Sequence, residues 1–65
     1  MNLQKLLEYV SGYVAIELWD ANNAHETIIR VKDKIEIPTR YLKCKIEPNS
    51  IIASQRGIVI SIITE

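Results

Sequence analysis

The alternation of apolar and polar residues predicts β-strand as the main structure of the chain, most clearly between residues 12 and 20. Successive side chains of a strand point to opposite faces of its sheet. One face of this strand then carries Val14, Ile16 and Leu18, and the other carries Tyr13, Ala15, Glu17 and Trp19. Both faces are largely apolar, whereas a strand with one solvent-exposed face alternates apolar with polar residues. We therefore expect two covered faces, one under a helix and the other against a second copy of the chain.

A short amphipathic helix is predicted ahead of this strand. Its apolar residues have the i, i+3, i+4, i+7 spacing of a helix that buries one side; they are Leu3, Leu6, Leu7 and Val10. Asn2 is well placed to cap the start, and Gly12 to end the helix in the left-handed conformation. So short a helix does not persist alone in water, and we expect it to lie on the wholly aliphatic face of the strand.

Turn-forming residues divide the rest of the chain into further strands. A hairpin loop is expected over residues 20–25, followed by a strand over residues 27–32 with Ile29 and Val31 inward and Ile28, Arg30 and Lys32 outward. Residues 35–37 alternate until Pro38, where a tight corner begins, and residues 42–46 alternate with Leu42, Cys44 and Ile46 on one face. Residues 51–54 and 58–64 are predicted to form a hairpin around the turn 55–57, with its second strand in the sheet interior.

The predicted fold class is α+β, with a short N-terminal helix packed on a small, mainly antiparallel sheet of four to five strands. The 65 residues are expected to form one domain, near the lower size limit of a self-sufficient core. Hydrophobic residues make up 48% of the chain, and the many isoleucines favour sheet. Cys44 is the only cysteine, so a disulfide within the chain is excluded, and packing or oligomerisation must supply the stability.

Charges balance overall but are unevenly distributed along the chain. Cations and anions number eight each, so net charge predicts neither nucleic-acid nor membrane binding. Residues 1–26 carry one cation and four anions, whereas residues 27–46 carry six cations and two anions. We expect no membrane association and no duplex DNA binding, because neither a long apolar run nor a helix-turn-helix pattern is found. The unpaired cysteine fits a reducing cytoplasm.

The sequence shows no catalytic motif and no metal-binding motif, so we expect no enzyme, no metal and no cofactor. His25 lacks the second histidine of a zinc-protease helix, because Ile29 stands at that position. We interpret His25 as a solvated loop residue. Cys44 lies between Leu42 and Ile46 on an apolar face and is interpreted as a packing residue rather than a nucleophile.

Two sets of residues are candidate binding surfaces. The first is cationic and suits a phosphate-bearing ligand or an acidic protein surface; it consists of Arg30, Lys32, Arg40, Tyr41, Lys43, Lys45 and Arg56. If the outer faces of their strands point the same way, these side chains form one patch. The alternative is that they only keep the sheet soluble and discourage pairing at its edges. The second set is expected at the interface of a two-fold dimer and consists of Tyr13, Trp19, Ile28, Val59 and Ile63.

Four stretches carry a resemblance to a class of viral proteins: residues 3–9, 14–20, 37–42 and 58–62. In this succession of helix, strand, Ile-Pro corner and final strand, the chain resembles short accessory proteins encoded by bacteriophages of Gram-positive bacteria. That class includes inhibitors of host defences, such as anti-CRISPR proteins, and proteins that sequester nucleotide signals. The resemblance implies an accessory role in the host cytoplasm and assigns no functional residue.

Two functions are predicted as alternatives. In the first, the chain is a non-catalytic protein that binds and occludes a host protein or nucleoprotein. In the second, an oligomer sequesters a phosphate-bearing small molecule, such as a signalling nucleotide, between its subunits.

Overall fold

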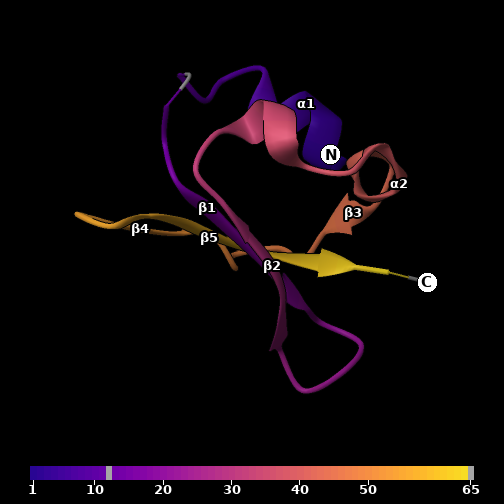
Figure 1. Ribbon diagram of the computed structural model, residues 1–65. Helices are drawn as coiled ribbons and strands as arrows, with labels where there is room; N and C mark the ends of the chain where they lie inside the picture. Colours follow the sequence, from indigo (N-terminus) through magenta and orange to yellow (C-terminus); the bar gives the residue numbers. More distant parts are fainter. Residues whose placement is uncertain (12, 65) are drawn as a thin grey trace.

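The computed structural model of the protein describes residues 1–11 and 13–64 and consists of a five-stranded sheet with short helices on one side (Figure 1). The strands are β1 (Ile16–Asp20), β2 (Glu26–Val31), β3 (Lys45–Ile46), β4 (Ile52–Ser54) and β5 (Gly57–Ile63). The helices are α1 (Leu3–Leu7), the 3₁₀ helix η1 (Lys34–Glu36) and α2 (Thr39–Leu42). The predicted α+β fold, with its N-terminal helix on a small sheet, is confirmed. Asn2 caps α1 as predicted, whereas the predicted role of Gly12 lies outside the described residues.

The sheet is mixed, with the strand order β2-β1-β5-β3. Its central pair, β1 and β5, is parallel, and the other pairings are antiparallel, including that of β4 with β5. β4 pairs with the beginning of β5 and β3 with its end, on the side away from β1. Two adjacent parallel strands need a long connection between them. Here the connection is residues 21–56, which include β2, η1, α2, β3 and β4.

The core lies between the helices and one face of the sheet. In the register, Ile16 stands beside Val31 and Ile58, and Leu18 stands beside Ile29 and Ile60. The largest fully buried side chains are Leu3, Ile16, Leu18, Ile60 and Ile62. Ile16 and Leu18 belong to the aliphatic face that alternation placed under the helix, so the prediction of a helix over that face is confirmed.

One segment predicted as a strand is mostly helical instead, and another is a strand only at its end. Residues 34–36 form η1, because Asp33 and Glu36 make a capping box: the Asp33 carboxylate accepts from the Ile35 amide at 3.2 Å and Glu36 accepts from the Asp33 amide at 3.0 Å. The corner after Pro38 continues as α2, which leaves only β3 of the strand expected over residues 42–46. The apolar side chains of that stretch still pack against the core; they are Leu42, Cys44 and Ile46.

Lys34 joins η1 to the end of α1. Its ammonium group donates hydrogen bonds to the carbonyl oxygens of Leu7, at 2.9 Å, and Val10, at 2.7 Å. Carbonyls at a helix C-terminus have no partner within the helix, and a nearby cation also favours their partial negative charge. The contact therefore fastens two segments that lie far apart in the sequence.

We expect Lys34→Met to lower the free energy of unfolding by about 1–2 kcal/mol, because the variant keeps the aliphatic stem and leaves two partly buried carbonyls without this donor. Urea denaturation followed by circular dichroism measures the change. Lys32→Met is the matched control, since the exposed Lys32 side chain makes no hydrogen bond or ion pair within the described residues. An equal loss in both variants would contradict this role of Lys34.

Candidate functional site

No helix of the described chain covers the second face of the sheet, which we call the open face. By strand register, its side chains are those of Glu17, Trp19, Thr27, Arg30, Lys45, Ile52, Ser54, Val59, Ser61 and Ile63. Trp19, Val59 and Ile63 are partly buried, and Ile52 is 51% exposed. The open face therefore combines apolar surface with a charged centre, whereas the sequence predicted a largely apolar face.

Glu17 organises the centre of the open face. Its carboxylate accepts a hydrogen bond from Trp19 Nε1, a second from Thr27 Oγ1 at 2.9 Å and a third from Arg30 Nε at 2.9 Å. Trp19 lies two positions along β1, and the register sets Arg30 opposite Glu17 and Thr27 opposite Trp19 on β2. We call these four residues the Glu17 cluster.

These contacts change the acidity of Glu17. The hydrogen bond from Trp19, followed by those from Arg30 and Thr27, lowers the pKa of the Glu17 carboxyl below its ordinary value of 4.5. Partial desolvation acts in the opposite direction and is outweighed. Glu17 is therefore ionised in the folded protein at neutral pH, as its acceptor role requires.

We expect the Glu17 cluster to make stability depend on pH in acid. Because the pKa of Glu17 is lower in the folded than in the unfolded chain, its contribution is complete above the unfolded value and is lost as the pH falls through the folded value. Between about pH 5 and pH 2, the urea midpoint of the wild type should therefore fall more steeply than that of Glu17→Gln. Parallel curves for the two proteins would contradict this assignment.

A groove of about 420 Å³ opens beside the Glu17 cluster, between β2 and the β4–β5 hairpin. Its lining includes Glu17, Arg30, Ser54, Arg56 and Val59, and we call it the arginine groove after its two arginines. Arg30 comes from β2, whereas Arg56 comes from the turn between β4 and β5. The fold thus joins two cations that are far apart in the sequence.

The cationic residues predicted from the sequence do not form one patch. Arg30 lies on β2 and Lys45 on β3, the strands at opposite ends of the order β2-β1-β5-β3. A second groove of about 290 Å³ lies at the β3 edge and is lined by Arg40, Lys43 and Lys45, among others. Lys32 lines neither groove. The alternation of residues assigns each side chain to a face of the sheet but does not give the order of the strands. It therefore could not show that Arg30 and the cations of the second groove lie at different edges of the sheet.

Tyr41, predicted with the cations, instead packs partly buried against the core. The guanidinium carbon of Arg40 lies 4.7 Å from the centre of the Tyr41 ring, and Arg40 Nη2 donates to the Tyr41 hydroxyl at 3.2 Å. Arg40 is thus held by its neighbour within the second groove.

The residues predicted at a subunit interface are also divided. Trp19, Val59 and Ile63 lie on the open face. Tyr13 does not, because it precedes β1 with a positive φ of 65° and is 93% exposed. Ile28 sits where the β1–β2 register shifts between Leu18 and Trp19, and it packs against the core. A β-bulge of this kind sets two residues against one and redirects a side chain, which alternation alone does not reveal.

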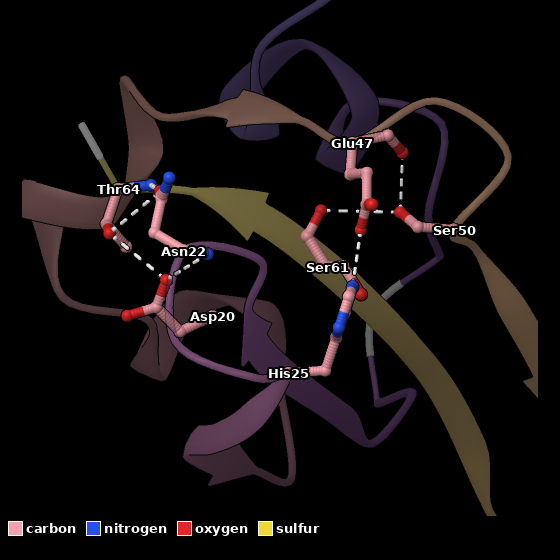
Figure 2. Close-up of polar contacts among 7 residues, drawn as sticks. All are labelled: Asp20, Asn22, His25, Glu47, Ser50, Ser61 and Thr64. Carbon is pink, nitrogen blue, oxygen red and sulfur yellow. Dashed lines mark hydrogen bonds and ion pairs between the residues drawn. The ribbon is translucent and has the colours of Figure 1, made fainter.

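A polar cluster joins the loops at the other end of the sheet (Figure 2). His25 Nε2 lies 2.8 Å from Glu47 Oε2, and this pair links the β1–β2 loop to the residue after β3. Ser50 Oγ donates to the Glu47 carbonyl oxygen at 2.5 Å, and the Glu47 amide donates to the Ser61 carbonyl oxygen at 2.9 Å. Ser61 is 2% exposed and lies beside the His25–Glu47 pair. These contacts hold the connection between β3 and β4 on β5.

The loop between β1 and β2 is also tied to the end of β5, by a second group of hydrogen bonds drawn in Figure 2. The Thr64 amide donates to Asn22 Oδ1 at 2.8 Å, and the Thr64 hydroxyl donates to Asp20 Oδ1 at 3.1 Å. The Asp20 carboxylate also accepts from the Asn22 amide at 2.9 Å, which shapes the turn.

The His25–Glu47 pair lacks the third member of a catalytic relay. Nucleophilic catalysis needs a hydroxyl or thiol within hydrogen-bond reach of the histidine. Within residues 1–11 and 13–64, the His25 side chain bonds to Glu47 and to no hydroxyl, while Ser50 Oγ faces backbone carbonyls. No group of three metal-ligating side chains occurs in this described part either. His25 lies in a loop as predicted, at 46% side-chain exposure, but the partnership with Glu47 had no local signal in the sequence.

Comparison with known proteins found no matching family model, no matching curated protein and no matching solved structure. None of the helices described here is long and apolar enough to span a membrane.

Proposed function

We propose that the chain is a non-catalytic accessory protein of the kind that bacteriophages encode, and that it binds and occludes a host macromolecule through its open face. The Glu17 cluster is the observation that supports this proposal. Trp19 and Arg30, which belong to the residue types that dominate interface binding energies, are both held by one carboxylate on the uncovered face of the sheet.

The cluster orders these two side chains before any partner arrives. Glu17 engages the indole N–H of Trp19 and the Nε of Arg30, while the Arg30 side chain remains 74% exposed. A partner can therefore contact the indole ring and the terminal guanidinium nitrogens with little further loss of side-chain entropy. Val59 and Ile52 extend the surface with aliphatic area. We propose a host protein or nucleoprotein in the cytoplasm, such as a component of a defence system, as the partner.

Affinity capture from host lysate tests the proposal when it is run with matched variants. We expect the wild type and Lys43→Ala to retain one specific partner, and Trp19→Ala and Arg30→Ala to lose it. Lys43 lies at the opposite edge of the sheet and controls for nonspecific charge effects. Arg30→Ala keeps the test valid where Trp19→Ala fails to fold, which circular dichroism reports. Retention of the partner by both open-face variants, or capture of no specific partner, would contradict the proposal.

The expected homodimer is better placed at the β4 edge than on the open face, whose centre is charged. Ile51 and Ile52 are 49% and 51% exposed, and among the described strands β4 pairs with β5 alone. The Ile58 amide donates to the Ala15 carbonyl at 2.9 Å, toward β1. Its β4 partner Ala53 therefore directs its own N–H and C=O to the free edge. An uncharged edge with unpaired backbone groups favours pairing with another strand, and we propose β4 of a second copy.

Light scattering at increasing protein concentration tests this dimer. We expect the wild-type mass to rise toward that of a dimer and Ala53→Pro to remain monomeric, because proline removes the N–H at the free edge and leaves the ladder with β5 intact. A wild type that stays monomeric at every concentration, or an Ala53→Pro variant that still dimerises, would contradict the proposal.

A further inference from the structure

We infer that the arginine groove is a binding site for a phosphate-bearing small molecule of nucleotide size. This site shares Glu17 and Arg30 with the proposed macromolecule-binding surface, and its second arginine, Arg56, lies outside the Glu17 cluster and distinguishes the two. The inference assigns the ligand to particular residues, Arg30 and Arg56, and leaves the lysines of the second groove out of the site.

Arg30 has a defined orientation within the groove. Its Nε donates to Glu17 Oε1 at 2.9 Å, and Glu17 is itself anchored by Trp19 and Thr27. This bond uses the inner donor of the guanidinium group and leaves the terminal nitrogens exposed. A planar guanidinium fixed in this way can donate two parallel hydrogen bonds to a phosphate group.

Arg56 supplies a second positive charge on a short turn. Its backbone amide donates to Ser54 Oγ at 3.2 Å, which holds the turn beside the groove. None of the ion pairs within the described residues includes Arg56, so its charge has no acidic partner there. An anion in the groove would provide that partner.

Glu17 does not prevent an anion from binding in the arginine groove. Its Oε1 accepts from Arg30 and its Oε2 from Trp19 and Thr27, so both oxygens face donors of the protein. The groove thus holds two guanidinium groups against one carboxylate that is already paired. Its remaining positive charge favours a phosphate over a neutral ligand.

The size and lining of the groove indicate more than a bare ion. Its volume of about 420 Å³ lies within the range of roughly 300–1,000 Å³ that is usual for small-molecule sites. Val59 contributes aliphatic surface for the remainder of the ligand. In the second groove, by contrast, Arg40 is already engaged by the Tyr41 ring and hydroxyl.

NMR titration of the purified full chain tests the site with defined probes: inorganic phosphate, pyrophosphate, AMP, cyclic di-AMP and adenosine. We expect one or more of the phosphate compounds to shift the signals of Arg30 and Arg56, and adenosine to bind at least about tenfold more weakly than its phosphorylated counterpart. Comparing the affinity for inorganic phosphate with the affinities for AMP and cyclic di-AMP distinguishes a simple anion site from a nucleotide site.

Matched variants locate the binding. Arg56→Gln should weaken the best ligand by about tenfold or more, the usual effect of one lost charge-assisted hydrogen bond, and Lys43→Gln should leave the affinity unchanged. The absence of shifts with every phosphate compound, or shifts centred on Arg40 and Lys43, would overturn the inference. Arg56→Gln should still capture the macromolecular partner, because Arg56 is not part of the Glu17 cluster, so the failure of one proposal is distinguishable from the failure of the other.

Discussion

Replacement of Gly57 by alanine is expected to remove most of the stability of the fold, about 3 kcal/mol. Gly57 has a φ of +135°, which side-chain-bearing residues rarely adopt, and a Cβ at this position would lie 2.3 Å from the Ala15 carbonyl oxygen. The same oxygen accepts the Ile58 amide at 2.9 Å where β5 meets the start of β1. Relief of the clash must therefore disturb the central parallel pair. A domain of this size has only about 3–5 kcal/mol in total.

Urea denaturation of Gly57→Ala, followed by tryptophan fluorescence and circular dichroism, measures this loss. Gln55→Ala is the matched control, because Gln55 is an exposed residue of the same turn and its replacement should change stability by no more than about 0.5 kcal/mol. A Gly57→Ala variant within about 1 kcal/mol of the wild type would show that the approach of Ala15 to Gly57 is not a constraint on the fold.

Leu18→Ala is expected to have a comparable or larger effect, about 3–4 kcal/mol. Leu18 is 0% exposed and stands in the centre of the sheet, between Ile29 of β2 and Ile60 of β5. Removing its side chain leaves a cavity beneath the helices. The β1 backbone is hydrogen-bonded to β2 on one side and β5 on the other, so it cannot move to close this cavity.

The same denaturation experiment tests the prediction, with Leu18→Met as the control of nearly equal volume. The methionine variant should lose less than about 1.5 kcal/mol and remain folded, while the alanine variant should be largely unfolded without denaturant. Similar losses in the two variants would indicate that cavity formation is not the cause.

The inward-facing residues of the strands could be predicted from the sequence, whereas the strand predicted over residues 35–37 was wrong and the one over residues 42–46 was too long. Alternation is a local property of extended backbone, so Ile16 and Leu18 were placed correctly without knowledge of their neighbours. Residues 35–37 alternate equally well but are largely helical. The spacing of Asp33 and Glu36 was the available signal, since it is that of a capping box.

The members of the candidate site were partly visible in the sequence, but their grouping was not. Trp19, Arg30 and Arg56 were each named as binding candidates, and Glu17 was placed on the same strand face as Trp19. Only the register of β1 against β2 sets Arg30 beside Glu17, and only the β4–β5 hairpin brings Arg56 to the same groove. Tyr13 and Ile28 do not share the open face with Trp19, because the positive φ of Tyr13 and the bulge at Ile28 are backbone irregularities that alternation does not reveal.

The sequence by itself determined the α+β composition, the position of the N-terminal helix over the aliphatic face and the lack of a disulfide within the chain. These properties follow from residue spacing and residue type, which act over a few positions. Tertiary structure alone decided that β1 and β5 pair in parallel, that Arg30 and Arg56 line one groove while Arg40, Lys43 and Lys45 line another, and that Glu17 holds Trp19 and Arg30 together. Strand order depends on packing between segments far apart in the sequence, such as Thr64 and Asn22, which are 42 residues apart and joined by a hydrogen bond, and no local pattern encodes it.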